Sequence, residues 1–202
     1  MSGLITRLLA PGLSGAEIWD EGQAIAVHPG ESVHVAGSAE KRRRDFALGR
    51  ACAHTALAGL GHAEVMIAKG EDGAPLWPPG IAGSITHTQG YAAALVGESF
   101  AGIGIDAERV GGVGRDLWPR LFSAAEQESL HAHPDPLLAA TLFFSAKEAS
   151  YKAWALKGAL AFREIEVVLE DDGFVATRAG VRLGGRYAVE KGVALVAAWT
   201  PR

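Results

Sequence analysis

A pattern of one long helix followed by an apolar strand occurs twice in this chain, and this repetition constrains the fold more than any single motif does. At an offset of 102 residues, segment 192–196 (GVALV) aligns with segment 90–94 (GYAAA), and Lys152 aligns with Arg50. A true repeat predicts an α+β protein of two similar lobes related by a pseudo-twofold axis, each a small sheet with a long helix, with the active site in the cleft between them. Chance alignment of alanine-rich segments is the alternative.

Hydrophobic spacing and helix-end signals predict the individual elements. A helix over residues 39–60 has Ser38 as a candidate N-cap and Gly61 as its stop, and a helix over 123–131 begins with a capping box. The longest helix is expected over 136–158, between a proline and a glycine. Apolar runs predict strands at 91–97, 100–110, 164–170, 181–183 and 186–199. The two lobes are expected at residues 1–100 and 101–202.

Length and composition exclude several classes of protein. The chain has 202 residues, of which 49% are hydrophobic and 21% charged, and this excludes a disordered chain. The net charge of −4 gives no reason to expect nucleic-acid binding, and a single cysteine excludes an intrachain disulfide. No apolar run reaches the roughly 20 residues that a membrane span needs. We therefore expect a cytoplasmic protein that binds neither nucleic acid nor membrane.

Three carboxylates form the sharpest candidate site. Asp106 and Glu108 lie two residues apart at the end of a predicted strand, so their side chains point to the same side. Glu148 lies in a predicted helix among small and apolar residues and shares its face with Lys152. Converging carboxylates repel one another unless a cation neutralises them, and oxygen ligands suit Mg²⁺. The alternative is a solvated strand end beside a surface ion pair.

A second candidate site is basic. The run 41–44 (KRRR) begins a predicted helix, and Arg50 lies two turns beyond Arg43, which predicts a shared face. Guanidinium groups suit phosphate, and cations at a helix start oppose the helix dipole, which favours a functional reason for them. Ser84 and His87 belong to a hydrogen-bonding cluster before an apolar run, where His87 could donate to a phosphate oxygen. A solvated charge run and a loop histidine are the alternatives.

Taken in order, five segments resemble the 4'-phosphopantetheinyl transferases of the enterobactin-synthase component D type. They lie between Lys41 and Trp154 and read KRRRDFALGRACA, GAPLWPPGIAGSITHTQGYAAALV, GIGIDAE, LFSAAEQ and FFSAKEASYKAW. The resemblance implies a monomer of two lobes that moves the 4'-phosphopantetheine group of coenzyme A to a serine of an apo acyl, aryl or peptidyl carrier protein. The product released would be adenosine 3',5'-bisphosphate, and the pathway served would make a siderophore or a secondary metabolite.

The resemblance also implies roles for individual residues. Mg²⁺ would be held by Asp106 and Glu148, with Glu108 as a third ligand or acting through water. Lys152 would contact the phosphates beside the metal, and either Glu148 or a water on the metal held by Glu108 would be the base. The coenzyme A phosphates would be bound by a polar and basic set, namely Ser84, His87, Arg43, Arg44 and Arg50. Two positions depart from similar relatives, because His54 stands where arginine is frequent and Ala74 where some have lysine.

Two other functions stay open at this point. The same carboxylates could serve an Mg²⁺-dependent phosphodiester hydrolase, and the cleft could belong to a non-catalytic module that binds coenzyme A or a carrier protein.

A carrier protein that is acidic around its serine would dock on an apolar surface rimmed by arginine. Three arginines, Arg109, Arg115 and Arg120, alternate with such apolar residues, namely Val110, Val113, Leu117, Trp118, Leu121 and Phe122. Alternatively, these apolar side chains close the core of the second lobe.

Overall fold

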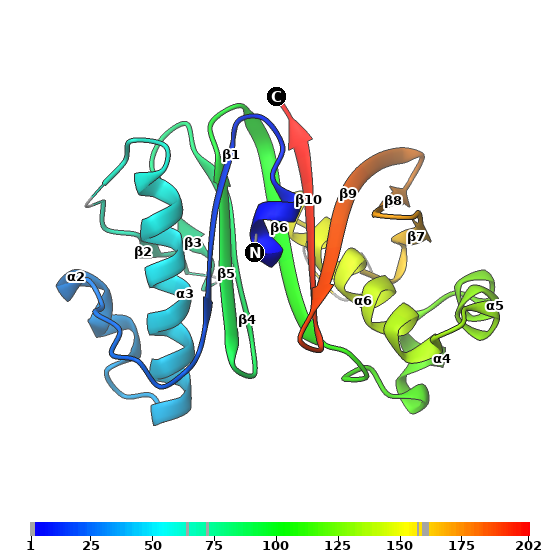
Figure 1. The fold of residues 1–202 in the computed structure, drawn as a ribbon. Helices are drawn as coiled ribbons and strands as arrows, with labels where there is room; N and C mark the ends of the chain where they lie inside the picture. Colours follow the sequence, from blue (N-terminus) through cyan, green and yellow to red (C-terminus); the bar gives the residue numbers. More distant parts are fainter. Residues whose placement is uncertain (1–2, 64, 72, 157, 159–161) are drawn as a thin grey trace.

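The computed structural model describes residues 3–202 except 64, 72, 157 and 159–161, and it consists of two lobes, each a sheet covered by a long helix (Figure 1). The first lobe contains a sheet with strand order β1-β5-β4, formed by Leu13–Trp19, Tyr91–Gly97 and Ala82–Thr88. Helix α3 (Glu40–Ala58) covers its outer face. The short elements of this lobe are α2 (Pro29–Ser32), η1 (Val33–Val35) and a ribbon of β2 (Ala68–Lys69) with β3 (Pro75–Leu76).

The second lobe contains a sheet with strand order β6-β10-β9-β8-β7. In chain order these strands are Phe100–Arg109, Glu166–Leu169, Gly173–Arg178, Val181–Glu190 and Val193–Pro201. Helix α6 (Pro136–Ala153) packs on this sheet, and the short helices η2 (Arg115–Leu117), α4 (Trp118–Leu121) and α5 (Ala124–Ala132) lie beyond its N-terminal end. The α+β fold of two lobes predicted from the sequence is therefore confirmed.

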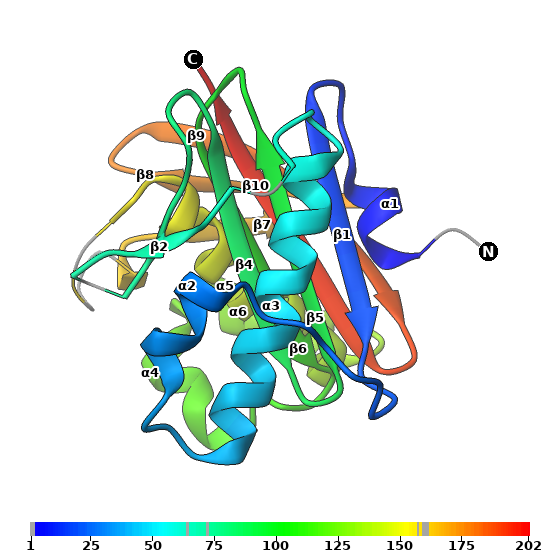
Figure 2. The same cartoon turned by 90° about the vertical axis from the view of Figure 1, so that its left-hand side faces the viewer.

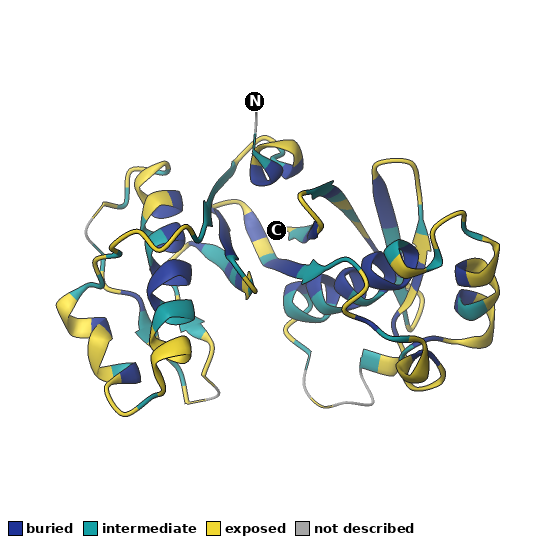
Figure 3. Cartoon of the chain, turned by 60° about the horizontal axis from the view of Figure 1, so that its bottom comes forward, coloured by how far each residue is buried: buried dark blue, intermediate teal, exposed yellow. Residues whose placement is uncertain are grey.

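The apolar interior is distributed over both lobes and the junction between them. One cluster lies between α3 and β5, and a second lies between α6 and the strands of its sheet. A third joins the lobes and includes residues of α1 (Leu4–Leu8), β5, β6, β9 and β10, with α1 lying beside β1 (Figure 2). Figure 3 shows the buried faces of the two long helices turned toward their sheets.

The repeat seen in the sequence corresponds to a repeat of structure. In each lobe a hairpin follows the long helix, and its turn contains a glycine with a positive φ, 74° at Gly90 and 72° at Gly192. A positive φ suits glycine because it has no Cβ. The two glycines are separated by the offset of 102 residues, and β5 lies between β1 and β4 as β10 lies between β6 and β9. The alignment is therefore not a product of chance.

Helix α6 approaches strand β6 so closely that only glycine fits between them. A Cβ built on Gly102 would lie 1.9 Å from the carbonyl oxygen of Ala153, and one on Gly104 would lie 1.8 Å from that of Ala149. Side chains alternate along a strand, so these glycines share the helix-facing side of β6 with Asp106. The close backbone contact thus sets the distance between the acidic strand end and α6.

Several predicted boundaries differ from the structure. Helix α3 begins after Ala39 without a side-chain cap, so Ser38 is not its N-cap, and α6 ends at Ala153 rather than 158; residue 157 of that prediction lies outside the described residues. The predicted strand 186–199 is two strands joined by a turn, and β8 was missed.

We predict that Gly104→Ala destabilises the protein and lowers its activity, because a methyl group there collides with backbone rather than with a flexible side chain. Overpacking of this kind costs roughly 1–3 kcal/mol or more, or a few degrees in Tm for each kcal/mol. Gly184→Ala in β9 is the matched control, since a Cβ at Gly184 meets nothing within 4 Å. Thermal denaturation measures both variants, and equal melting temperatures would contradict the prediction.

Candidate active site

The acidic end of β6 and the C-terminal end of α6 form one charged cluster. Lys152 on α6 donates to the Oδ1 atom of Asp106 at 2.8 Å and to the carbonyl oxygen of Ile105 at 3.0 Å. Asp106 is only 7% exposed, and its other oxygen, Oδ2, is buried without a hydrogen-bond partner among the described residues. A buried carboxylate oxygen with no donor is costly, so this atom is suited to receive a cation or a ligand.

The other two carboxylates of the cluster are electrostatically coupled to Asp106. Burial, followed by repulsion from Asp106, raises the pKa of Glu108, and the same two causes raise the pKa of Glu148. Lys152 opposes both shifts. The three carboxylates and the lysine that the sequence singled out therefore interact electrostatically.

The chemistry of this donor set fits a hard divalent cation. All three acidic side chains offer carboxylate oxygens, which are the ligands that Mg²⁺ prefers, and the unpartnered Oδ2 of Asp106 lacks only a positive partner. Within the described ranges, no three histidine, cysteine or carboxylate side chains are close enough to enclose a metal ion. The cluster is thus open, with Lys152 supplying the positive charge to Asp106.

A hydrogen bond between the lobes aligns this cluster with the first lobe. The backbone N–H of Ala107 on β6 donates to the Oγ1 atom of Thr86 on β4 at 2.9 Å, and both groups are buried. Thr86 immediately precedes His87, and Ala107 immediately follows Asp106. The bond therefore holds the histidine strand beside the carboxylate strand.

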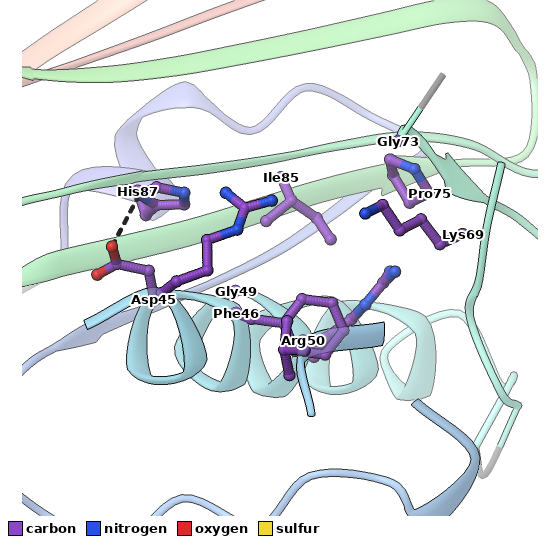
Figure 4. Close-up of a pocket in the computed structure, with 11 residues that line it drawn as sticks. Asp45, Phe46, Gly49, Arg50, Lys69, Gly73, Pro75, Ile85 and His87 are labelled. Atoms are coloured by element: carbon purple, nitrogen blue, oxygen red, sulfur yellow. Dashed lines mark ion pairs between the residues drawn. The ribbon is translucent and has the colours of Figure 1, made fainter. Parts of the chain in front are cut away.

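A pocket of about 180 Å³ in the first lobe is lined by cations from α3 and β2 and by a histidine of β4 (Figure 4). Figure 4 shows Arg50 from α3 and Lys69 from β2 projecting into the space beneath the strand that carries Ile85 and His87. The polar and aromatic side chains that line it are Arg42, Asp45, Phe46, Arg50, Lys69 and His87. Such a set of donors suits a phosphate group.

Arg50 is held in this pocket by burial and by one carboxylate. It is 4% exposed, and burial lowers the pKa of its guanidinium while Glu31 opposes that shift. The Arg50 Nε atom lies 3.9 Å from an oxygen of Glu31, and its guanidinium lies 5.0 Å from the ring centre of Phe46. The Nε and Nη1 atoms are buried and make no hydrogen bond in the described part of the chain. A buried guanidinium with unused donors is a prepared anion site.

His87 lies at the other end of the same pocket, on strand β4 rather than in a loop. Burial lowers the pKa of its imidazole, and Lys41, Arg42 and Lys152 lower it further against the opposing effect of Asp45. Its Nδ1 atom lies 4.0 Å from the carboxylate of Asp45. A phosphate bound here would reverse the balance and favour the charged imidazolium.

A second pocket, of about 680 Å³, adjoins the cationic pocket and reaches Lys152 of the charged cluster. Its wall includes Ser84 from the first lobe and Tyr151 and Lys152 from the second, so it lies between the lobes. The two pockets share Gly73, Pro75 and Ile85. An elongated ligand can therefore reach from the cations of the first lobe to Lys152.

Arg43 and Arg50 share a face of α3, but they do not line the same pocket. Arg43 and Arg44 line a separate depression with Asp20, while Arg42 shares the pocket of Arg50. Arg44 is engaged by Asp20, with Nη2 2.5 Å from the carboxylate, and Arg43 donates to the carbonyl oxygen of Ser38. Positions 42, 46, 49 and 50 of α3 face the pocket, a helical spacing that could have identified Arg42. Lys69 had no sequence signal, because it stands in a short ribbon.

The apolar surface expected between Arg115 and Arg120 is largely absent. Val113, Trp118 and Phe122 are each at most 5% exposed and belong to the core of the second lobe, so they close that core. Arg115 stacks on Trp118 at 5.3 Å, and only Leu117 of the apolar set is exposed among these described residues. Arg120 instead lines a pocket of about 410 Å³ beside Glu148.

We predict that Glu148→Gln and Glu108→Gln stabilise the metal-free protein near neutral pH. A carboxyl whose pKa is raised on folding costs stability above that pKa, and the cost disappears as the pH falls through the raised value toward the ordinary value of 4.5. The variants should therefore melt a few degrees above the parent at about pH 7, with the difference vanishing at about pH 4.5. Thermal denaturation in chelator measures this, with the exposed Glu128→Gln as the neutral control.

The comparisons with known proteins agree with this geometry. The first lobe matches the family model of the 4'-phosphopantetheinyl transferase N-terminal domain over residues 30–97, and the second lobe matches that of the 4'-phosphopantetheinyl transferase superfamily over residues 102–194. The chain is 42% identical over 175 residues to the 4'-phosphopantetheinyl transferase Npt of Nocardia iowensis, covering 84% of this chain and 79% of that protein.

Two further relatives extend the likeness. The 4'-phosphopantetheinyl transferase PptT of Mycobacterium tuberculosis is 34% identical over 206 residues, covering 92% of this chain and 91% of that protein. Enterobactin synthase component D of Escherichia coli is 35% identical over 131 residues, covering 63% of this chain and 62% of that protein. With both lobes matched and two relatives covered over most of their length, the chain belongs to the 4'-phosphopantetheinyl transferase superfamily.

Proposed function

We propose that this protein transfers the 4'-phosphopantetheine group of coenzyme A to a serine of an apo carrier protein and that it requires Mg²⁺. The observation that carries the proposal is the continuity of the site: a pocket of phosphate-binding cations shares its wall with a pocket that contains Lys152. That lysine is paired with Asp106, whose second oxygen has no partner among the described residues. An extended ligand with phosphates at two places fits this arrangement.

The reaction is a displacement at the β-phosphorus of coenzyme A. The serine oxygen forms a bond to that phosphorus, and the bond from the phosphorus to the oxygen bridging to the α-phosphate breaks. The electron pair leaves with adenosine 3',5'-bisphosphate, and the serine proton passes to a base. Charge grows on the equatorial and leaving oxygens, so cations fixed in place supply most of the catalysis.

Asp106, Glu108 and Glu148 would hold the metal ion, with Glu108 acting directly or through water. When bound, Mg²⁺ neutralises the charge of the pyrophosphate and lowers the repulsion among the three carboxylates. Lys152, placed by its bonds to Asp106 and the Ile105 carbonyl, adds a positive charge beside the phosphates. The base that takes the serine proton would be Glu148 or a water held by Glu108.

Arg50 and His87 are the residues we propose for the coenzyme A phosphates in the first lobe, and Arg42 and Lys69 join them from the same pocket. Ser84, in the wall that also contains Lys152, would contact the ligand between the two ends. Arg43 and Arg44 are not part of this proposal, because their side chains are engaged elsewhere. The departure at position 74 lies in the wall of the connecting pocket.

The proposal also covers the lobe boundary, the location of the protein, its oligomeric state and its partners. The lobes divide near residue 100, supported by family matches that end at 97 and resume at 102. No helix in the described ranges is long and apolar enough to cross a membrane. We propose a cytoplasmic monomer that acts on a carrier protein of siderophore or secondary-metabolite synthesis, without nucleic acid or membrane as a partner; the acidic net charge of −4 supports the first of these absences.

One experiment separates the proposed transferase from its two rivals. The protein is incubated with coenzyme A, Mg²⁺ and an apo carrier protein, and the carrier is weighed by mass spectrometry. Gain of a phosphopantetheine group on the carrier supports the transferase. Release of free phosphopantetheine without modification would indicate a phosphodiester hydrolase, and unchanged coenzyme A and carrier would indicate a binding module.

We predict that Asp106→Ala and Glu148→Ala abolish transfer while the protein remains folded. Each variant removes a metal ligand but also relieves repulsion within the cluster, so the fold tolerates the loss. Glu108→Ala should reduce the rate less if its contact with the metal passes through water. The readout is the initial rate of carrier modification against Mg²⁺ concentration, and normal Mg²⁺-dependent turnover of Asp106→Ala would overturn the metal site.

We predict that Arg50→Ala raises the KM for coenzyme A more than it lowers kcat, since it removes a phosphate contact of the ground state. The loss of a charge-assisted hydrogen bond corresponds to roughly 10- to 100-fold in KM. Arg43→Ala is the matched control on the same helix and should behave like the parent. Repeating the assay with 3'-dephospho-coenzyme A identifies the phosphate: an equal loss with both substrates would show that Arg50 does not contact the 3'-phosphate.

A further inference from the structure

Beneath the cationic pocket lies a glutamate that the reaction does not use directly. Glu31, on the short helix α2, is fully buried, with 0% of its surface exposed. Its Oε1 atom accepts from the backbone N–H of Ile67 at 2.7 Å and lies 3.0 Å from Nε2 of His54, while its Oε2 lies 3.9 Å from Nε of Arg50. Burying a carboxylate costs free energy, and the groups that pair with it offset that cost.

The partners of Glu31 belong to two elements that carry pocket cations. Arg50 projects from α3, and its Nη2 atom lies 3.5 Å from the carbonyl oxygen of Ala68. Ile67, whose N–H binds Glu31, directly precedes the β2 strand of Ala68 and Lys69. One carboxylate therefore contacts the helix and the ribbon that place Arg50 and Lys69 on opposite sides of the pocket (Figure 4).

Resting on the proposed function, we propose that Glu31 is a positioning residue for coenzyme A binding. It holds the guanidinium of Arg50 and the ribbon of Lys69 so that their unused N–H groups point to the phosphate. His54 lies on the next turn of α3 and is 25% exposed, and the contact of its Nε2 atom with Oε1 holds the Glu31 carboxylate in place. The histidine that replaces the arginine of similar relatives thus acts through Glu31 instead of binding the phosphate itself.

A glutamate in the other lobe offers a matched comparison. Glu126 is also buried, 4% exposed, and accepts from the backbone N–H of Val167 at 2.9 Å. It pairs with Lys147 at 2.8 Å, and none of these groups lines the cationic pocket. Glu126→Gln should therefore lower stability as Glu31→Gln does, without changing the binding of a ligand of the first lobe. This separates positioning from a general effect on folding.

The test measures binding of adenosine 3',5'-bisphosphate by calorimetry, because this fragment lacks the pantetheine arm. Glu31→Gln keeps an acceptor for Ile67 but turns amide hydrogens toward a guanidinium that has lost its counter-charge. We expect its Kd to rise roughly tenfold, about 1.4 kcal/mol, and that of His54→Ala to rise less, while Glu126→Gln binds as the parent does. On an Arg50→Ala background, Glu31→Gln should have little further effect, as expected for residues that act together.

Unchanged or tighter binding by Glu31→Gln, or full additivity with Arg50→Ala, would overturn the inference while transfer by the parent protein still stands. A parent that neither binds the bisphosphate nor modifies a carrier would instead overturn the proposed function. If circular dichroism shows Glu31→Gln to be unfolded, His54→Ala decides the matter, since its side chain is partly exposed and alanine suits a helix. Binding by His54→Ala equal to that of the parent would then count against the proposal.

Discussion

The close contact between α6 and β6 is the constraint on which the site depends. Because Gly102 and Gly104 have no side chains, the carbonyl groups of Ala149 and Ala153 lie almost on the strand. Glu148 and Lys152 each precede one of these alanines, and Asp106 continues the glycine face of β6. A helix held at ordinary packing distance would carry Lys152 beyond the 2.8 Å that now joins it to Asp106. The close backbone contact therefore allows Lys152 to pair with Asp106.

Such a tight arrangement of like charges is unstable without a cation. Burial and mutual repulsion raise the pKa values of Glu108 and Glu148, and Lys152 compensates only part of this effect. The first lobe contains the opposite imbalance, because Arg50 is buried with two unused nitrogen atoms. A magnesium ion and a phosphate chain together would neutralise both. Uncompensated charges at each end of the groove lower the stability of the ligand-free protein, which is typical of a site that binds a charged ligand.

The sequence predicted the fold and the carboxylate cluster because both depend on local spacing. Period-two alternation placed Asp106 and Glu108 on one side of a strand, and the capping box at Ser123 marked the start of α5. It did not predict which arginines face the pocket, since the rotation of α3 is decided by packing of Gly49 against Ile85. Nor could it place Glu31 or Lys69, whose roles arise from contacts between segments far apart in the chain.

The repeat accounts for a difference in charge between equivalent positions of the two lobes. At the 102-residue offset Lys152 corresponds to Arg50, so each long helix contributes a cation at an equivalent place. The strand pairs extend the comparison: Asp106 pairs with Val196 and Glu108 with Ala194, and in the first lobe the equivalent partners pair with Ala16 and Ile18. Those two side chains pack against the apolar cluster beneath α3. At the positions equivalent to Asp106 and Glu108 the first lobe therefore has no carboxylates, so the proposed metal site lies in the second lobe.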